Sequence, residues 1–212
     1  MKPSYIPAFH FRWLTAYYDR FMARLYPEQR FRGDLIAQAR LGAGQRVLDM
    51  GCGTGTLTLM IKASAPGAEV VGLDVDADVL AIARAKIGQA GAHIDLEQGS
   101  AAQLPFADGS LDRVFASLML HHLTREDKRR ALKEVLRVLK PGGELHVIDF
   151  GVPDSRAALL ISLLVRWFEE IRDNIRGLVP VFLREAGFEP VEETARYATV
   201  SGTLRAYRAC KP

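Results

Sequence analysis

The sequence predicts an α/β domain built on a mostly parallel sheet, and three observations support this fold class. Short runs rich in β-branched and other apolar residues alternate with stretches of helical periodicity. A glycine-rich turn joins the first of these runs directly to a helical stretch. The last two runs flank Ser201-Gly202, which is typical of a two-residue hairpin turn. An antiparallel hairpin is a common ending for such a sheet.

The individual elements follow from these patterns. Strands are expected at residues 46–50, 69–74, 93–97, 113–117, 144–149, 195–200 and 203–209. Helices are expected at residues 56–63, 77–90, 125–139 and 181–186, the last ended by Gly187. Pro141-Gly142-Gly143 is typical of a stop and turn before the fifth strand. A further helix, capped by Asp154 or Ser155, is expected through the apolar stretch that ends at Phe168.

Upstream of the first strand, large apolar residues recur at every fourth position and predict an amphipathic helix over about residues 9–26. Its ridge consists of Phe9, Trp13, Tyr17, Phe21 and Leu25. Two interpretations are open for this helix. It packs on the sheet, or its aromatic residues also cover a ligand cleft, in which case Tyr17 and Tyr18 are the candidates for closing over the ligand.

Length and composition exclude several classes of protein. A chain of 212 residues and 23.5 kDa fits a single domain over residues 1–212. A hydrophobic fraction of 49% and a charged fraction of 25% are those of an ordinary globular protein. The net charge of +3 permits an anionic partner but does not demand one. Two cysteines, Cys52 and Cys210, and no export signal favour the reducing cytoplasm. The most apolar stretch, residues 157–168, is too short to span a membrane.

The glycine-rich turn indicates a ligand that contains a nucleoside. Gly51, Gly53 and Gly55 have no Cβ to block a close approach, and the helix that follows presents free N–H groups. Asp74 ends the next strand and lies 74 − 55 = 19 residues after Gly55. This is close to the offset at which a carboxylate reaches a ribose.

The glycine spacing favours an amino acid joined to a nucleoside over a dinucleotide. Dinucleotide-binding turns follow G-x-G-x-x-G/A, whereas this turn is G-x-G-x-G with Thr56 at the next position. Asp49 precedes the turn, where a carboxylate would repel a pyrophosphate but can accept hydrogen bonds from an ammonium group.

Four motifs resemble the class I S-adenosylmethionine-dependent methyltransferases, and in particular the small-molecule branch that includes the ubiquinone and menaquinone biosynthesis enzymes. These motifs are VLDMGCGTG (47–55), VVGLDVD (70–76), LPFADGSLDRVFASLMLHHL (104–123) and RVLKPGGELHVIDF (137–150). The resemblance implies a Rossmann-like, seven-stranded, mostly parallel sheet with helices on both faces and a C-terminal antiparallel hairpin. It also implies S-adenosylmethionine as the cofactor and S-adenosylhomocysteine as its product.

Carried over residue by residue, the resemblance implies a set of cofactor-binding positions. The methionine part would lie against Asp49, Gly51, Cys52, Gly53 and Gly55, with Asp74 on the ribose. The adenine would lie beside Val75, Ser100 and Ala101; many relatives have Asp in place of Ser100, which implies a different adenine contact here. Leu111 replaces the usual Phe and is interpreted as a core substitution.

The end of the fourth strand, Ser117 to His122, should face the cofactor at the carboxyl edge of the sheet. Ser117, Leu118 and His122 are expected to contact the cofactor, and His121 and His122 are the candidates for accepting a proton. No third metal ligand accompanies the two histidines, so no metal is expected. Cys52 is interpreted as a packing residue rather than a nucleophile. Asp149 lines the site or is satisfied by a nearby helix terminus.

The activity implied is in-line methyl transfer to a small apolar or aromatic acceptor, chosen by the helix over residues 9–26 and the insertion over about 151–180. Trp167, Phe168 and nearby arginines in that insertion either cover the sheet or make a peripheral contact with a membrane surface. The alternatives are a nucleic-acid methyltransferase, an NAD-dependent oxidoreductase and a cofactor-binding module without catalysis. The weak net charge and the apolar Leu118-Met119-Leu120 argue against the first, so no nucleic acid is expected. The sequence does not specify the acceptor or the oligomeric state.

Overall fold

The computed structural model describes residues 28–154, 171–199 and 202–212. Its strands are β1 (Arg46–Met50), β2 (Glu69–Asp74), β3 (Asp95–Gln98), β4 (Leu111–Ser117), β5 (Leu139–Phe150), β6 (Val191–Thr199) and β7 (Gly202–Cys210). Its helices are α2 (Glu28–Ala39), α3 (Thr56–Ser64), α4 (Ala77–Gln89), the short 3-10 helix η1 (Leu120–His122), α5 (Arg125–Val138), α7 (Ile171–Ile175) and α8 (Val179–Ala186).

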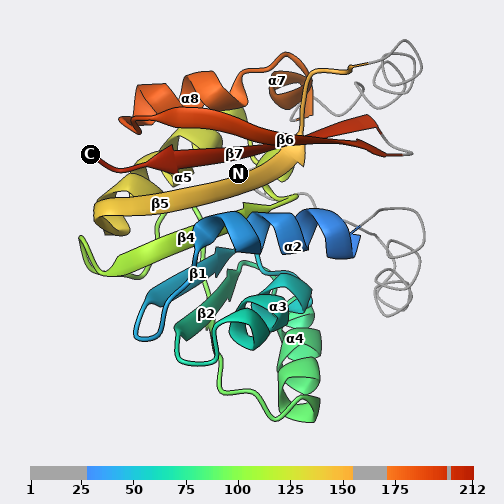
Figure 1. The fold of residues 1–212 in the computed structure, drawn as a ribbon, viewed down its shortest axis with the longest axis vertical. Coiled ribbons are helices and arrows are strands. Elements are labelled where there is room, and N and C mark those ends of the chain that lie inside the picture. Colours follow the sequence, from blue (N-terminus) through green and yellow to red (C-terminus); the bar gives the residue numbers. More distant parts are fainter. Residues whose placement is uncertain (1–27, 155–170, 200–201) are drawn as a thin grey trace.

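The strands form a single seven-stranded sheet in the order β3-β2-β1-β4-β5-β7-β6 (Figure 1). The pairs from β3 to β5 are parallel, whereas β7 is antiparallel to both β5 and β6. This architecture confirms the predicted fold class, including the antiparallel hairpin at the C-terminus. The chain reverses its direction of travel across the sheet between β1 and β4, so ligands are expected at the carboxyl ends of these two strands.

Helices cover both faces of the sheet because side chains along each strand alternate between two cores. On β4, Val114 and Ala116 belong to the core that includes α5 and α8. Phe115, between them, belongs to the core that includes α2 and α3. Both cores are apolar, so burying them accounts for the sandwiching of the sheet between two helical layers.

Local signals set several of the helix ends. The carboxylate of Asp76 accepts hydrogen bonds from the N–H groups of Asp78 (2.9 Å) and Val79 (3.3 Å) at the start of α4. The hydroxyl of Thr124 accepts from the N–H of Asp127 (3.1 Å) at the start of α5. At the end of α8, Gly187 has φ 110°, a value that L side chains rarely adopt.

Several sequence-based boundaries differ from the structure. The third strand covers Asp95–Gln98 rather than residues 93–97. Pro141-Gly142-Gly143 does not end the chain before the strand but lies inside β5, where it forms a bulge. Between the pairs Leu111–Leu139 and Arg113–Glu144, the single residue Asp112 of β4 stands opposite the four residues 140–143 of β5. Gly202 pairs with Thr199 and therefore belongs to β7 rather than to the turn, where the sequence predicted it. Helices α2 and α7 were not predicted.

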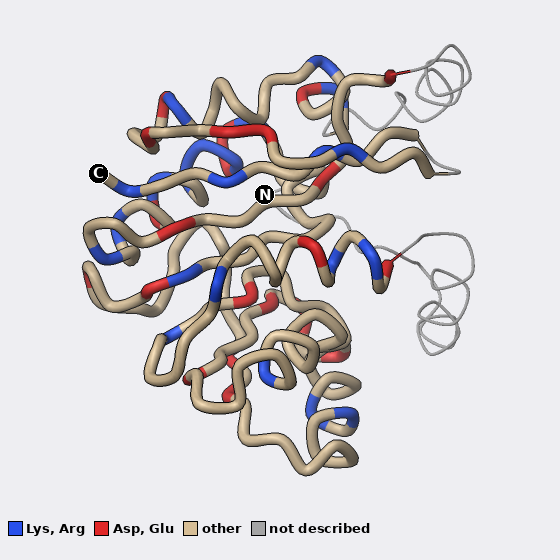
Figure 2. Tube along the Cα trace, viewed as in Figure 1, with Lys and Arg blue, Asp and Glu red and all other residues tan. Residues whose placement is uncertain are grey.

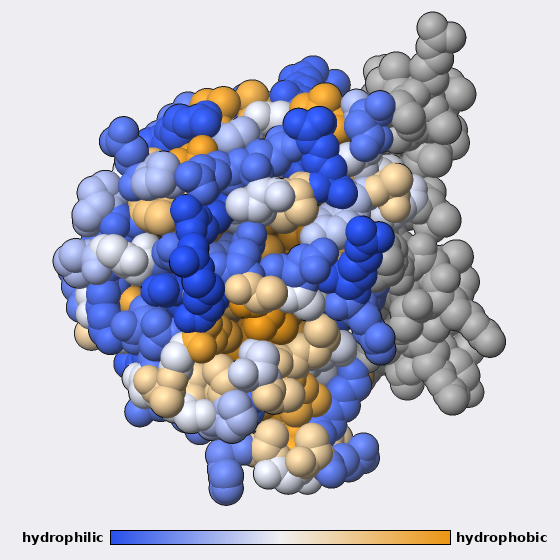
Figure 3. All heavy atoms as spheres, viewed as in Figure 1, coloured by the Kyte–Doolittle hydropathy of each residue, from blue (hydrophilic) through white to orange (hydrophobic). Residues whose placement is uncertain are grey.

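Charges on the hairpin strands are paired rather than gathered into a basic stripe. Figure 2 shows acidic residues of β6 beside basic residues of β7, and Arg208 contacts Glu192 (2.9 Å) while Arg205 contacts Glu193 (2.8 Å). In the same view, Figure 3 shows hydrophilic residues over the hairpin and an apolar area over α3. On these two strands, each of these arginines therefore has a carboxylate beside it.

Candidate active site

The glycine-rich turn after β1 is built from left-handed backbone. Gly51, Gly53 and Gly55 have φ values of 72°, 55° and 76°, in the region that only glycine adopts without strain. The N–H groups of Gly51 (2.7 Å) and Cys52 (3.0 Å) both donate to the carbonyl of Leu73. The turn is thereby held against the end of β2, and α3 begins directly after Gly55.

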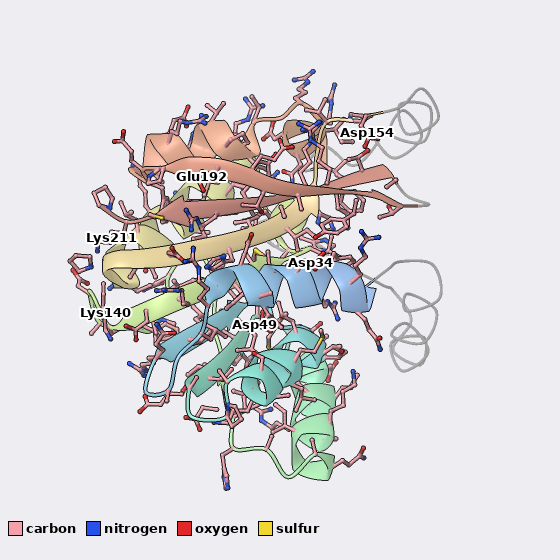
Figure 4. All side chains as sticks on the ribbon, in the orientation of Figure 1. Asp34, Asp49, Lys140, Asp154, Glu192 and Lys211 are labelled. Carbon is pink, nitrogen blue, oxygen red and sulfur yellow. The ribbon has the colours of Figure 1, made fainter. Side chains whose placement is uncertain are left out.

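Asp49 lies at the base of this turn and is almost completely buried. In Figure 4 its label stands between α2 and α3. Only 1% of Asp49 is exposed, and the hydroxyl of Thr58 donates to its Oδ2 at 2.6 Å. Burial raises the pKa of Asp49 to about 6, an increase that the Thr58 hydrogen bond and the charge of Arg32 reduce. A buried carboxylate with a raised pKa is well suited to accept a cationic group of a ligand.

Asp74 closes the other side of the turn. Its Oδ2 accepts from the N–H of Gly53 at 2.9 Å and its Oδ1 from the N–H of Asp76 at 3.0 Å. Burial raises the pKa of Asp74, although these two N–H groups counteract that effect. The motifs predicted to act together on a nucleoside therefore contact each other directly.

The three positions expected to lie beside an adenine gather after β2 and β3. The N–H of Gly99 donates to the carbonyl of Asp74 (2.9 Å), which brings the two strand ends together. Val75 is 42% exposed, unusual for a large apolar residue, whereas Ala101 is buried. The hydroxyl of Ser100 accepts from the N–H of Ala102 at 3.2 Å.

Cys52 packs against β2. A Cβ built on Gly72 would lie 3.0 Å from its Sγ, and burial raises the pKa of the Cys52 thiol. A buried, protonated thiol is a poor nucleophile, in agreement with the interpretation of Cys52 as a packing residue.

The segment after β4 crosses the glycine-rich turn. Leu118 has φ 54°, a strained value for a residue other than glycine, and its N–H donates to the carbonyl of Ile148 (2.8 Å). A Cβ on Gly51 would lie 2.8 Å from the Cβ of Met119, so the two loops are in contact. The hydroxyl of Ser117 is buried and has no hydrogen-bond partner among the described residues.

His121 and Asp149 form a hydrogen-bonded pair at the ends of β4 and β5. His121 Nδ1 lies 2.8 Å from Asp149 Oδ1, and the Asp149 side chain is fully buried. The burial of Asp149 would raise its pKa, but the His121 ring and the N–H of Phe150 (2.7 Å) hold that pKa below its usual value. The N–H of His121, within η1, also donates to Asp149 Oδ2 at 3.2 Å, so a nearby helix terminus satisfies Asp149, as one of the two interpretations expected.

His122 lies beside this pair and differs from it electrostatically. Its ring centroid is 4.1 Å from that of His121. Burial and the neighbouring His121 lower the pKa of His122 to about 4, so His122 is neutral at neutral pH. The two adjacent histidines thus differ in their partners: His121 has a carboxylate within hydrogen-bond distance, while burial disfavours a proton on His122.

Arg32 on α2 is a site residue that the sequence patterns missed. Its charge is one of the groups that lower the pKa of Asp49, and its Nε is buried without a hydrogen-bond partner among the described residues. Its Nη1 lies 3.1 Å from Glu28 Oε2. Arg32 belongs to no motif, and the helix that carries it was not predicted, so no sequence signal indicated this position.

Other predictions fall outside the described residues. Tyr17 and the helix over residues 9–26 lie there, as does most of the helix expected after Asp154. Within the described ranges, no group of three metal-ligating side chains occurs, and no helix has the length and apolar character to cross a membrane.

Comparisons with known proteins agree with this geometry. Residues 47–143 match the family described as "Methyltransferase domain". The chain is 38% identical over 150 residues to demethylmenaquinone methyltransferase of Thermus thermophilus, covering 71% of this chain and 66%, just under two thirds, of that relative. It is 36% identical over 173 residues to the enzyme of the same name from Lactiplantibacillus plantarum, covering 79% and 68%.

A solved structure has the same fold. The YcgJ protein of Bacillus subtilis superposes with a TM-score of 0.69 at 19% identity, covering 85% of this chain and 97% of that one. With these relatives, this sheet order and this glycine-rich turn, the chain belongs to the class I S-adenosylmethionine-dependent methyltransferases.

Proposed function

We propose that this protein transfers the methyl group of S-adenosylmethionine to a ring carbon of a small, apolar hydroquinone. The demethylmenaquinone methyltransferases, to which the chain is similar, support an acceptor of the quinone type. The observation that carries the chemical class is the His121–Asp149 pair at the carboxyl ends of β4 and β5, because it supplies a proton acceptor at the sheet edge where a hydroxylated ring would meet the cofactor.

The proposed cofactor position follows the carboxyl edge of the sheet. Asp49 would accept hydrogen bonds from the ammonium of the methionine part, and the backbone of Gly51, Cys52, Gly53 and Gly55 would follow its chain. The guanidinium of Arg32 would hold the α-carboxylate that accompanies this ammonium, since it is the cation that already acts on Asp49. The amino acid end of the cofactor, a zwitterion, would thus meet one carboxylate and one guanidinium.

The nucleoside would lie across the ends of β2 and β3. Asp74 would accept from the ribose hydroxyls, using the lone pairs not already engaged by Gly53 and Asp76. Val75 would cover one side of the adenine, with Ser100 and Ala101 at its edge. Ser117, Leu118 and His122 would contact the cofactor from β4, and Tyr17 would close over it.

The reaction is an in-line displacement in which the protein mainly positions the nucleophile. His121 accepts the proton of a ring hydroxyl, while Asp149 orients the imidazole and stabilises its charged form. The electron-rich ring carbon then forms a bond to the methyl carbon as the bond from methyl to sulfur breaks, leaving neutral S-adenosylhomocysteine. Loss of the ring proton at that carbon and return of a proton to the oxygen restore the aromatic ring. One proton is released overall.

We place this activity in the cytoplasm, because both cysteines of the chain are free thiols, as in reducing compartments. A peripheral contact with a membrane surface would give access to acceptors with lipid tails. The relatives are named methyltransferases, which argues against the oxidoreductase reading. A cofactor-binding module without catalysis is the remaining alternative, and turnover of any acceptor would exclude it.

The test has two stages. Calorimetric titration with S-adenosylmethionine and S-adenosylhomocysteine, with NAD as the control, should give micromolar binding of the first two only. The protein with S-adenosylmethionine and chemically reduced 1,4-naphthoquinone should then form S-adenosylhomocysteine and a ring-methylated product, detected by mass spectrometry. Binding without turnover of any hydroquinone would overturn the proposed acceptor, and binding of NAD alone would overturn the proposed reaction.

A further inference from the structure

Asn174 on α7 is a buried amide for which the described residues supply no hydrogen-bond partner. Its exposed fraction is 0%, and neither Oδ1 nor Nδ2 has a hydrogen-bond partner within the described part of the chain. Nearly all buried polar side chains in proteins are paired, and leaving one unpaired destabilises the fold. The amide is therefore a feature that core packing alone does not explain.

The position of α7 places this amide at the edge of the sheet that carries the candidate active site. Helix α7 packs against both η1, which contains His121 and His122, and β5, which contains Asp149. Gly177, just after α7, approaches the residues that follow β5: a Cβ built there would lie 2.8 Å from a methyl group of Val152. Figure 1 likewise shows α7 near the carboxyl end of β5.

The residue before Asn174 fixes this short helix in place. Asp173 is buried and accepts two hydrogen bonds from the guanidinium of Arg125, one of them from Nε at 3.0 Å. Arg125 is the first residue of α5 and follows η1 by three positions. A helix of five residues has little stability of its own, so this bidentate pair and the packing on η1 hold Asn174 against the segment that carries His121.

We infer that Asn174 is an acceptor-binding residue, whose amide hydrogen-bonds to an oxygen on the ring of the quinone-type acceptor. This inference rests on the proposed function. An amide suits both redox forms of such a ring, because Nδ2 donates to a carbonyl or phenolate oxygen and Oδ1 accepts from a hydroxyl. The amide already loses its contact with water when the protein folds. A hydrogen bond to a ring oxygen therefore requires no further removal of water from the amide. Because the amide is fully buried, this contact requires the side chains that cover it to move aside.

The first test uses the fact that Asn174 is the only asparagine in the sequence. Full-length protein labelled with ¹⁵N at asparagine alone has a single side-chain NH₂ pair in an NMR spectrum. With S-adenosylhomocysteine bound, titration with 1,4-naphthoquinone should shift this pair. A pair that stays unmoved while the methyl proton signals of the same sample report saturation by the quinone would overturn the inference.

The second test compares kinetics and stability. Asn174→Leu keeps the size of the side chain and removes the amide, so it should raise the melting temperature of the free protein. The same variant should raise KM for reduced 1,4-naphthoquinone by about 10-fold, the loss of one hydrogen bond, and leave the Kd of S-adenosylmethionine unchanged. Gln89→Leu, at the exposed end of α4, is the matched control and should change neither constant.

The outcomes separate the two proposals. Wild-type turnover with an unchanged KM in Asn174→Leu overturns the role of Asn174 alone. Absence of both turnover and quinone binding in the wild type overturns the proposed acceptor, and this inference with it. If the leucine variant does not fold, Asn174→Ala is measured in its place, and the NMR titration needs no substitution.

Discussion

His121 Nδ1 lies 2.8 Å from Asp149 Oδ1, and the backbone N–H of His121 donates to the other oxygen of the same carboxylate at 3.2 Å. The ring of His121 also meets that of Phe150 edge to face, with centroids 5.0 Å apart. These contacts fix the orientation of the imidazole at the point where β4 and β5 end. A histidine so oriented beside a buried carboxylate is a suitable general base.

His121→Gln should therefore lower kcat for a hydroquinone by about 100-fold, within the range typical of general-base catalysis, and leave the Kd of S-adenosylmethionine unchanged. Asp149→Asn should also lower kcat, because the neutral asparagine amide does not stabilise a protonated imidazole at His121 as the carboxylate does. His93→Gln, exposed before β3, is the control. Steady-state kinetics and calorimetry measure both constants, and an unaltered kcat in His121→Gln would exclude His121 as the base.

Asp74→Asn should weaken binding of S-adenosylmethionine and S-adenosylhomocysteine by about 10- to 100-fold, the usual effect of losing hydrogen bonds to a charged group. The substitution retains the shape of the side chain, so circular dichroism should stay that of the wild type. Asp95→Asn, at the start of β3, serves as the control and should bind normally. Wild-type affinity in Asp74→Asn would show that the ribose lies elsewhere.

Asp49 should make cofactor binding depend on pH. Its pKa is raised to about 6 in the folded protein, above 3.8, so the folded chain holds this proton more tightly than the unfolded chain. The contribution of Asp49 to stability therefore falls as pH rises from about 4 to about 6. Affinity for S-adenosylmethionine should rise over the upper part of the same window, because the ammonium needs the carboxylate.

Asp49→Asn provides the comparison. This variant should bind the cofactor weakly at every pH and should melt at a higher temperature than the wild type at pH 8, where the buried charge is costly. Calorimetric titrations and melting curves between pH 5 and pH 8 test both expectations. An affinity that does not vary with pH in the wild type would contradict the assigned ammonium contact.

Arg32→Gln should weaken S-adenosylmethionine binding by about 10-fold, since one charge-assisted contact with the α-carboxylate is lost. Arg32→Lys should recover part of that affinity. A truncated ligand without the α-carboxylate distinguishes loss of this contact from a general disturbance of the fold. This ligand should bind equally to the wild type and to Arg32→Gln. A loss of equal size for the truncated ligand would argue that Arg32 acts through the fold.

His146, on β5, should make the fold sensitive to acid. It is fully buried and stacked on Phe115, and Gln38 Nε2 donates to its Nδ1 at 3.0 Å. Glu144 Oε2 lies 3.2 Å from Nε2, but at an angle that does not make a hydrogen bond. Burial, with the charges of Arg113 and Arg208, lowers the pKa of His146 to about 3.

Because this pKa is depressed below 6.5, the unfolded chain takes up the proton first as pH falls. The contribution of His146 to stability is complete above about pH 6.5 and decreases down to about pH 3. His146→Gln should flatten the loss of melting temperature between pH 7 and pH 4. Identical profiles in wild type and variant would contradict this assignment.

The sequence was informative wherever a local rule determined the structure. The bounds of β1 and β2 agree with the prediction, because glycine follows β1 at once and an aspartate ends the apolar run of β2. The bulge in β5 was missed because proline and glycine usually end an element, whereas here the neighbouring strand supplies the pairing. Arg32 and Asn174 were missed for another reason: their significance depends on contacts between elements distant in sequence, which no periodicity records.

The two hydrogen bonds that Asp74 accepts come from the backbone of the protein itself, at Gly53 and Asp76. These bonds hold the carboxylate in one rotamer, so its ordering entropy is lost during folding rather than during binding. A nucleoside docking here would meet a rigid receptor. Variants that loosen this corner should speed cofactor dissociation much more than they slow its association.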